Sequence, residues 1–378
     1  MTVRNRIDYE HTLQALGICI SARVPVLLWG APGEGKTAVV ESARDGGWHV
    51  ETLIVSHYEP SDFAGLPVIG KDGSVTLAPP GWATRLASMD GPAIAFFDEF
   101  STASPALQAA ALRPLTHFEV GALQLPDTVS FVAAANPADV AASGWELAAP
   151  TASRFVHLEW ALPLEVYAEC LVTGDWPALP VYPMPADQEA ARARQRVLVA
   201  GFLRARESQI SAIPSDAAAR GRAFPTPRTW DYATRLAAFA VAVGAPAEVI
   251  RMLVTGCIGD VTAHEFLAWS SAQDLPDPED LLADPHAFDF TGVRPDRVYV
   301  ILQAVLGAVA RLTTAQRWTD GVTLCARAGK AVGIDPAVPV VRALLRDGMR
   351  PADAALPSGI TVFAPALALA GLLGPAAA

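Results

Sequence analysis

Eight residues at 30–37 constrain the fold more than any other segment of the chain. They read Gly-Ala-Pro-Gly-Glu-Gly-Lys-Thr, the pattern G-x-x-x-x-G-K-[ST], between an apolar run at 24–29 and an Ala/Val-rich segment at 38–43. In this pattern the glycines let successive backbone N–H groups point at phosphate oxygens, and the N-terminus of the following helix adds a favourable dipole. A strand before the loop and a helix after it therefore predict a phosphate-binding loop.

The pattern also assigns roles within the loop. We expect the backbone to surround the phosphates of a nucleoside triphosphate, the Lys36 ammonium to reach the β- and γ-phosphates, and the Thr37 hydroxyl to bind Mg²⁺. The predicted nucleotide-binding set is Gly30, Ala31, Pro32, Gly33, Glu34, Gly35, Lys36 and Thr37. The alternative is a glycine turn before a helix that happens to begin with Lys-Thr, and the flanking segments make it the weaker interpretation.

Length and charge narrow the classes of function. The chain has 378 residues, enough for two or three domains with a sizeable core, and 52% of them are hydrophobic. The net charge of −11, from 28 basic and 39 acidic residues, disfavours a broad nucleic-acid-binding surface, although a local basic groove stays open. The four cysteines lie far apart without a C-x-x-C pair, which is typical of buried, reduced thiols in a cytosolic protein.

Neither end of the chain indicates a membrane span. Residues 1–10 contain no apolar run of the signal-peptide type, so we expect a cytoplasmic protein. The segment after Asp353 is uncharged, but Pro357, Pro365 and Pro375 interrupt it and its unbroken apolar stretch is too short to cross a bilayer. Packing in the interior or at a subunit contact is the favoured interpretation of this segment.

Strand-like and helix-like segments alternate up to about residue 162. This alternation favours a doubly wound parallel α/β sheet. A Pro/Gly-rich excursion at 59–82 contains a predicted β-hairpin, with strands at 66–69 and 74–77. We expect the helix at 104–113 to end at Pro114 and two strands to follow at 119–125 and 128–134. Beyond residue 162 the pattern is helical.

Two further apolar strands end in polar side chains. The run 93–97 is followed by Asp98, which is expected to hold Mg²⁺, and by Glu99, which is expected to polarise the attacking water. The run 129–135 is followed by Asn136, whose amide is expected to contact the γ-phosphate or position the water. Each motif is weak alone, because many strands end in an acid or in an Asn-Pro turn, but the loop at 30–37 strengthens both.

Two arginines are candidates for charge stabilisation. Arg154, in Ser153-Arg154-Phe155, is expected to reach the phosphates of a neighbouring subunit with its five-donor guanidinium. From spacing alone, a surface arginine paired with a local acid is the favoured alternative. Thr226 and Pro227 predict a helix start, and Arg228 in the first turn opposes the helix dipole, which a bound anion or a nearby carboxylate would explain.

The order of these motifs resembles that of a AAA+ ATPase of the MoxR type. The resemblance covers about residues 1–270 and implies a P-loop core at 1–162 and a helical lid at 163–270. Residues 271–378 do not match the family, and their helical pattern predicts a C-terminal accessory helical region. It implies that Glu99, Asn136, Arg154 and Arg228 act as Walker B glutamate, first sensor, arginine finger and second sensor, with ATP and Mg²⁺ as ligands. Pro114 and Thr116-His117 depart from the pattern, because the family's helix continues there into an acidic turn.

The resemblance also implies partners and an activity. Family members usually form hexameric rings and act as chaperone-like remodellers, often alongside a protein with a von Willebrand A domain. The excursion at 59–82 resembles the family's helix-2 insert, in which Phe63, Pro67 and Trp82 either contact a client or pack on the core. A nucleic-acid motor and a slow, nucleotide-gated scaffold are the alternative functions. ATP rather than GTP follows from the family and not from the motifs.

Overall fold

The computed structural model describes residues 5–137, 144–346 and 348–369. The chain folds as two compact units, one of Met1–Arg192 with Ser208–Glu265 and one of Ala193–Glu207 with Phe266–Ala378. The sequence did not indicate that residues 193–207 group with the C-terminal unit. The three-part division into 1–162, 163–270 and 271–378 stays a prediction.

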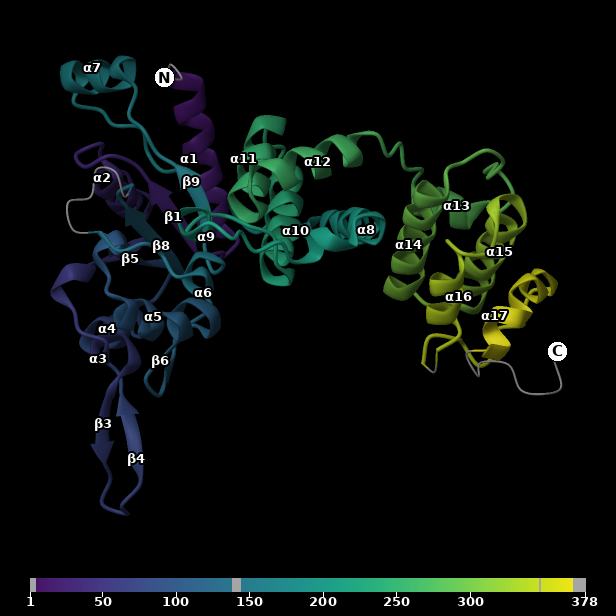
Figure 1. Cartoon of the computed structure of the whole chain (residues 1–378), viewed down its shortest axis with the longest axis horizontal. Coiled ribbons are helices and arrows are strands. Elements are labelled where there is room, and N and C mark those ends of the chain that lie inside the picture. The colour runs from purple at the N-terminus through teal and green to yellow at the C-terminus, as the bar shows by residue number, and fades with distance from the viewer. Residues whose placement is uncertain (1–4, 138–143, 347, 370–378) are drawn as a thin grey trace. The chain divides into compact units, whose positions relative to one another are not determined.

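A five-stranded parallel sheet forms the centre of the first unit (Figure 1). Its order is β2-β5-β8-β1-β9, so the strand before the phosphate loop lies between two strands from later in the chain. The strands are β1 (Val26–Trp29), β2 (His49–Ile54), β5 (Ala93–Asp98), β8 (Val129–Ala135) and β9 (Val156–Glu159). All seven residues of β8 are buried, as expected for a strand covered on both faces. The predicted doubly wound α/β fold is confirmed.

Helices cover the sheet and link its strands in the first unit. They are α1 (Arg6–Ser21), α2 (Lys36–Glu41), α3 (Ser61–Ala64), α4 (Gly81–Ala87), α5 (Pro105–His117), α6 (Ala149–Ala152), α7 (Leu164–Thr173), α9 (Ala217–Arg220), α10 (Pro227–Ala242) and α11 (Ala247–Ile258). Short 3-10 turns are η1 (Ser42–Gly46), η2 (Val55–His57), η3 (Phe100–Thr102) and η4 (Glu207–Ile210). Thr226 is the N-cap of α10 and Pro227 its first residue, as predicted, and Thr229 completes a capping box.

The predicted end of a helix at Pro114 is wrong. Helix α5 continues through Pro114 to His117. A proline inside a helix removes one backbone hydrogen bond and costs about 3 kcal/mol. Burial of Leu115, which is 1% exposed in the core of the first unit, offsets part of that cost.

Two small antiparallel hairpins leave the sheet. The predicted hairpin in the 59–82 excursion is confirmed as β3 (Leu66–Ile69) and β4 (Val75–Ala78), and it extends away from the rest of the first unit (Figure 1). The segment expected as one strand at 119–125 is itself a hairpin of β6 (Glu119–Val120) and β7 (Leu123–Gln124). A Cβ atom at Gly65 would lie 2.8 Å from the Cα of Gly121, so this close approach of the two hairpins requires glycine.

Phe97 is the centre of the aromatic core of the first unit. Its ring centroid lies 5.2 Å from that of Phe63, 6.1 Å from that of Trp82 and 5.4 Å from that of Phe131. Phe63 and Trp82 are 1% and 3% exposed, so these residues of the insert pack on the core of their own chain. Of the three proposed client contacts, Pro67 is the one with an exposed side chain.

The described part of the second unit is mainly helical. Its apolar core is formed mainly by α14 (Pro295–Arg311), α15 (Ala315–Val332) and α16 (Val338–Leu344). Further elements are α13 (Pro278–Ala283), η5 (Ser358–Phe363) and α17 (Ala364–Leu369), while α8 (Gln188–Ala205) and α12 (Asp260–Ser271) cross the boundary between the units. Within the described ranges, no helix combines the length and apolar character needed to cross a membrane. The C-terminal segment past residue 369 lies outside the described residues.

We expect Phe97→Ala to lower the free energy of unfolding by about 4 kcal/mol, because it opens a cavity among the rings of Phe63, Trp82, Phe100 and Phe131. Urea denaturation followed by circular dichroism measures the change. Val68→Ala in the exposed hairpin is the control, expected to change the free energy by less than about 0.5 kcal/mol. Equal shifts for the two variants would contradict the assignment of Phe97 to the core.

Candidate functional site

The predicted phosphate loop connects β1 to α2 and has the backbone that its glycines permit. Gly33 and Gly35 have φ angles of 79° and 78°, in the left-handed region that disfavours other residues. The indole of Trp160 supports the loop, because its Nε1 donates a hydrogen bond to the Glu34 carbonyl at 2.8 Å. The loop ends where α2 begins, so the first N–H groups of that helix lie at the site.

Lys36 is held by three oxygen acceptors at the mouth of the loop. Its Nζ donates to the carbonyl oxygens of Gly30 and Ala31 at 2.7 and 2.8 Å and to Oδ1 of Asn136 at 3.0 Å. Burial lowers the pKa of Lys36, while the nearby carboxylates of Glu34 and Asp98 act in the opposite direction. The ammonium is thus poised beside the position that the motif assigns to the phosphates.

Thr37 and Asp98 meet at the carboxyl edge of the sheet, where β1 and β5 end on either side of β8. The Thr37 hydroxyl donates to Oδ2 of Asp98 at 2.7 Å, joining the loop after β1 to the end of β5. Hydroxyl and carboxylate oxygens are the hard donors that Mg²⁺ prefers, and magnesium is usually bound by one or two such side chains plus phosphates. These two residues therefore fit a magnesium ion, as the sequence predicted for them.

Glu99 occupies a strained position next to Asp98. Its φ and ψ angles are 56° and 35°, a left-handed conformation that is uncommon for a residue with a side chain. Its carboxylate accepts a hydrogen bond from the Ser56 hydroxyl at 3.3 Å. Strain of this kind concentrates at functional sites, where the surrounding structure holds it.

A cavity of about 350 Å³ joins these groups. Its walls include the loop residues Pro32, Gly33, Gly35, Lys36 and Thr37, together with Ala38, Asp98, Glu99, Ala134 and Asn136. Eight of the predicted site residues therefore line one cavity: Pro32, Gly33 and Gly35 of the loop, together with Lys36, Thr37, Asp98, Glu99 and Asn136. The cavity falls in the size range of small-molecule sites, and its cationic and carboxylate groups suit a magnesium-bound phosphate chain.

Arg154 and Arg228 lie beside each other and outside the lining of this cavity. Arg154 donates from Nε to the Thr116 hydroxyl and from Nη1 to the Pro150 carbonyl, both at 2.5 Å, and Arg228 donates to the Ser153 hydroxyl at 3.2 Å. Burial lowers the pKa of Arg154, and the charge of Arg228 lowers it further. Among the described residues, no carboxylate forms a salt bridge with either guanidinium.

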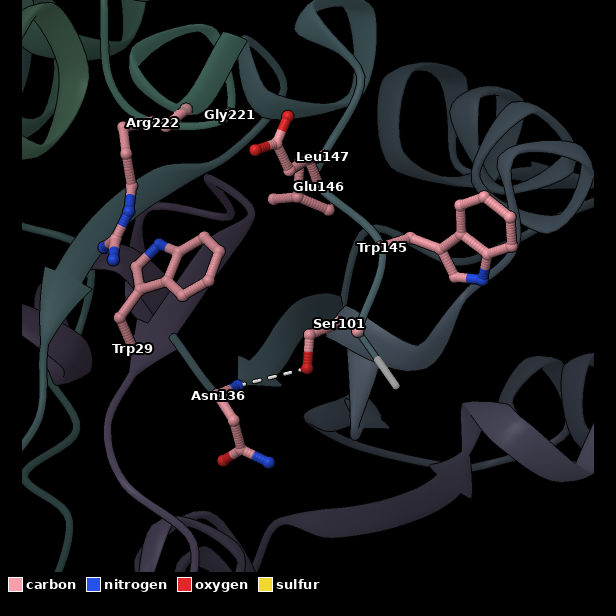
Figure 2. A pocket seen from close by; sticks show the side chains of 10 residues that line it. Trp29, Ser101, Asn136, Trp145, Glu146, Leu147, Gly221 and Arg222 are labelled. Carbon is pink, nitrogen blue, oxygen red and sulfur yellow. Dashed lines mark hydrogen bonds between the residues drawn. The ribbon is translucent and has the colours of Figure 1, made fainter. Parts of the chain in front are cut away.

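A second cavity of about 120 Å³ adjoins Asn136 (Figure 2). Its lining includes Trp29, the last residue of β1, and the Arg222 guanidinium lies 3.8 Å from the centroid of the indole. The Trp29 Nε1 donates to Nδ1 of His157 at 2.9 Å, so the other ring nitrogen of a neutral His157 carries the proton and donates to the Ala152 carbonyl at 3.0 Å. His157 therefore joins the strand before the phosphate loop to the helix before Arg154.

Sequence reasoning missed several polar residues that support the site. Ser56 contacts Glu99, the Ser101 hydroxyl accepts a hydrogen bond from the Asn136 N–H at 3.2 Å, and Gln108 is 1% exposed. Only the structure shows that Gln108 is buried and therefore needs hydrogen-bond partners. The contacts of the two serines cross 43 and 35 residues, and no local pattern indicates them.

The stability of the protein should fall as the pH decreases from about 6.5 to 4. Burial, together with the charge of Arg222, lowers the pKa of His157 to about 4, although its bond to Ala152 opposes the shift. Over that interval the unfolded chain binds a proton that the folded chain does not, which costs about 3 kcal/mol. Urea unfolding at pH 7 and pH 4.5 measures the difference.

His157→Gln provides the control for this pH dependence. A glutamine amide can accept from Trp29 and donate to Ala152 without titrating, so the part of the pH dependence due to His157 should disappear. An equally steep loss of stability in both proteins would show that other groups are responsible.

Comparison with protein-family models agrees with the geometry. Residues 25–155 match a family model described as the AAA domain of the dynein-related subfamily. A solved structure described as "a putative ATPase from Cytophaga hutchinsonii" aligns at 15% identity and a TM-score of 0.42, covering 68% of this chain and 88% of the other. The search of curated proteins gave no match. Residues 25–155 are therefore similar to an AAA domain, and the MoxR subtype stays a prediction.

Proposed function

We propose that the protein binds and hydrolyses ATP between neighbouring subunits of a ring, and that it uses this cycle to remodel or activate a protein partner. The observation that carries the proposal is the meeting of Lys36, Thr37, Asp98, Glu99 and Asn136 in one cavity. The match of residues 25–155 to an AAA domain supports the same chemistry.

Each residue has a role that its position supports. On nucleotide binding, the Lys36 ammonium would replace its hydrogen bonds to the loop carbonyls with hydrogen bonds to phosphate oxygens. The carbonyls and the phosphates would lie close together, so the ammonium would need to move little. Glu99 accepts a proton from the attacking water as general base. The Asn136 amide, whose Oδ1 accepts a hydrogen bond from Lys36, would contact the γ-phosphate. Thr37 and Asp98 would hold Mg²⁺, which when bound neutralises charge on the phosphate oxygens.

The arginine pair supports a site completed by a second subunit. Two half-buried guanidinium groups beside each other repel, and the described part of this chain offers them no carboxylate. An anion from outside the chain would relieve that repulsion, and the triphosphate bound by a neighbouring subunit has the required charge. We therefore assign Arg154 as arginine finger and Arg228 as second sensor, both acting on the neighbour's nucleotide.

The hairpin of β3 and β4 is the proposed contact for the protein partner. Leu66, Val68, Ile69 and Val75 are 57%, 47%, 76% and 63% exposed on it. An exposed apolar patch on a projecting element is typical of a protein-interaction surface. A partner with a von Willebrand A domain is the candidate that the family resemblance implies, and the hexameric ring rests on the same resemblance.

Replacing Glu99 tests the hydrolytic role directly. We expect Glu99→Gln to lower steady-state ATP hydrolysis by about 10²–10³-fold, because the amide cannot accept the proton. Binding of a fluorescent ATP analogue should stay within about threefold of the wild type, and Lys36→Ala should abolish it. The exposed Glu59→Gln serves as the control, and retained turnover in Glu99→Gln would remove Glu99 from its assigned role.

Hydrolysis should also depend on assembly. We expect the rate per chain to rise with protein concentration, and Arg154→Ala or Arg228→Ala to lower the assembled rate by about 10³-fold while nucleotide binding persists. The exposed Arg113→Ala is the matched control. A dilute monomer that turns over as fast as the assembled form would show that the site is complete within one chain.

A further inference from the structure

Gln108 is a buried polar side chain that contacts both the turn after Glu99 and the segment before Arg154. It lies on α5, it is 1% exposed, and its amide makes three hydrogen bonds to backbone groups. Its Nε2 donates to the carbonyls of Ala103 at 3.1 Å and Glu146 at 3.3 Å, and its Oε1 accepts from the N–H of Ala148 at 3.0 Å. Three of the four hydrogen bonds available to a glutamine side chain are thus made inside the protein.

Two of these bonds hold the segment that leads to Arg154. We call residues 144–154 the arginine arm. Residues 144–148 have no regular secondary structure, Ala148 is the N-cap of the single-turn helix α6, and Arg154 follows that helix. The arm has no strand pairing of its own, so its backbone groups depend on side-chain partners such as Gln108.

A third contact links the arm to the nucleotide site. The Trp145 N–H donates to the Ser101 carbonyl at 2.8 Å, and the Ser101 hydroxyl accepts from the Asn136 N–H at 3.2 Å (Figure 2). Ser101 lies in η3, the turn that begins directly after Glu99. The turn after Glu99 and the arginine arm are therefore bonded to each other through Ser101 and Gln108.

Helix α5 holds the arm at both ends. Gln108 binds the arm where it begins, and Thr116, in the last turn of the helix, accepts from the Arg154 guanidinium. This contact gives a partner to Thr116, one of the residues that departs from the family pattern. The continuation of α5 through Pro114 is what brings Thr116 to Arg154.

We propose that Gln108 is a positioning residue that fixes the arginine arm relative to the turn after Glu99, so that it sets the placement of Arg154 for the neighbouring site. The inference rests on the proposed function, in which Arg154 acts on another subunit's nucleotide. Without the amide, the Glu146 carbonyl and the Ala148 N–H lose their buried partner and the arm can shift. A misplacement of about 1 Å is enough to cost a large factor in rate.

Mixed assemblies separate this role from a structural one. A donor subunit with Lys36→Ala lacks a working nucleotide site but offers Arg154, whereas an acceptor subunit with Arg154→Ala has a working site but offers no finger. Each is inactive alone, and their mixture should hydrolyse ATP where a donor faces an acceptor. Gln108→Met, similar in length but unable to make the three hydrogen bonds, is then added to the donor or to the acceptor.

We expect Gln108→Met in the donor to lower hydrolysis by the mixture at least about tenfold, and the same change in the acceptor to lower it much less. Gln124→Met in the donor is the matched control, because Gln124 is exposed and binds the His117 and Phe118 carbonyls at the end of α5 instead of the arm. Light scattering and thermal melting verify assembly and folding. Gln108→Glu, which keeps an acceptor for Ala148, replaces Gln108→Met if the latter does not fold.

The mixtures test the shared nucleotide site and the positioning role of Gln108 separately. No hydrolysis by the parent mixture would overturn the shared site, and the role of Gln108 would fall with it. Hydrolysis by the parent mixture that a folded Gln108 variant in the donor leaves unchanged would overturn the positioning role alone. Equal losses from donor and acceptor would identify Gln108 as a structural residue of its own subunit and would also overturn the proposal.

Discussion

The parallel pairing of β1, β5 and β8 is the constraint on which the site depends. Trp29 pairs with Ala135 and Phe97 with Ala133, so the three strands end at one edge of the sheet. The Gly30 N–H even continues the pairing, since it donates to the Ala135 carbonyl at 3.2 Å. A phosphate loop, two carboxylates and an amide that are distant in sequence meet because of this register. Slippage by one residue would turn their side chains to the other face.

Charge is distributed unevenly between the two halves of the site. The Lys36 ammonium is surrounded by carbonyls, an amide and nearby carboxylates. Its positive charge is therefore compensated by groups of the same chain. The two arginines face each other without an acid among the described residues. Under the proposed mechanism, one chain holds the nucleotide, and a second copy stabilises the charge that develops during the reaction.

The sequence was sufficient for local features and insufficient for contacts across the fold. The phosphate loop, the strand ends at Asp98 and Asn136 and the hairpin at 66–78 follow from glycine placement and apolar runs. The prediction that the helix ends at Pro114 was wrong. A proline inside a helix costs free energy locally, but burial of the following turn in the core outweighs that cost. Ser101 and Gln108 could not be placed, since their partners lie 35 to 44 residues away and depend on the finished sheet.

The backbone conformation of Glu99 costs stability at the position proposed for the general base. A glycine would adopt the backbone angles at this position without penalty, so keeping a glutamate there forgoes about 1 kcal/mol of stability. The same left-handed turn begins η3, whose Ser101 contacts both Asn136 and the arginine arm. Relaxing the backbone at residue 99 would thus gain stability locally and loosen parts of the site that residue 99 does not touch. Under the proposed mechanism, a glycine would stabilise this turn but could not act as the general base.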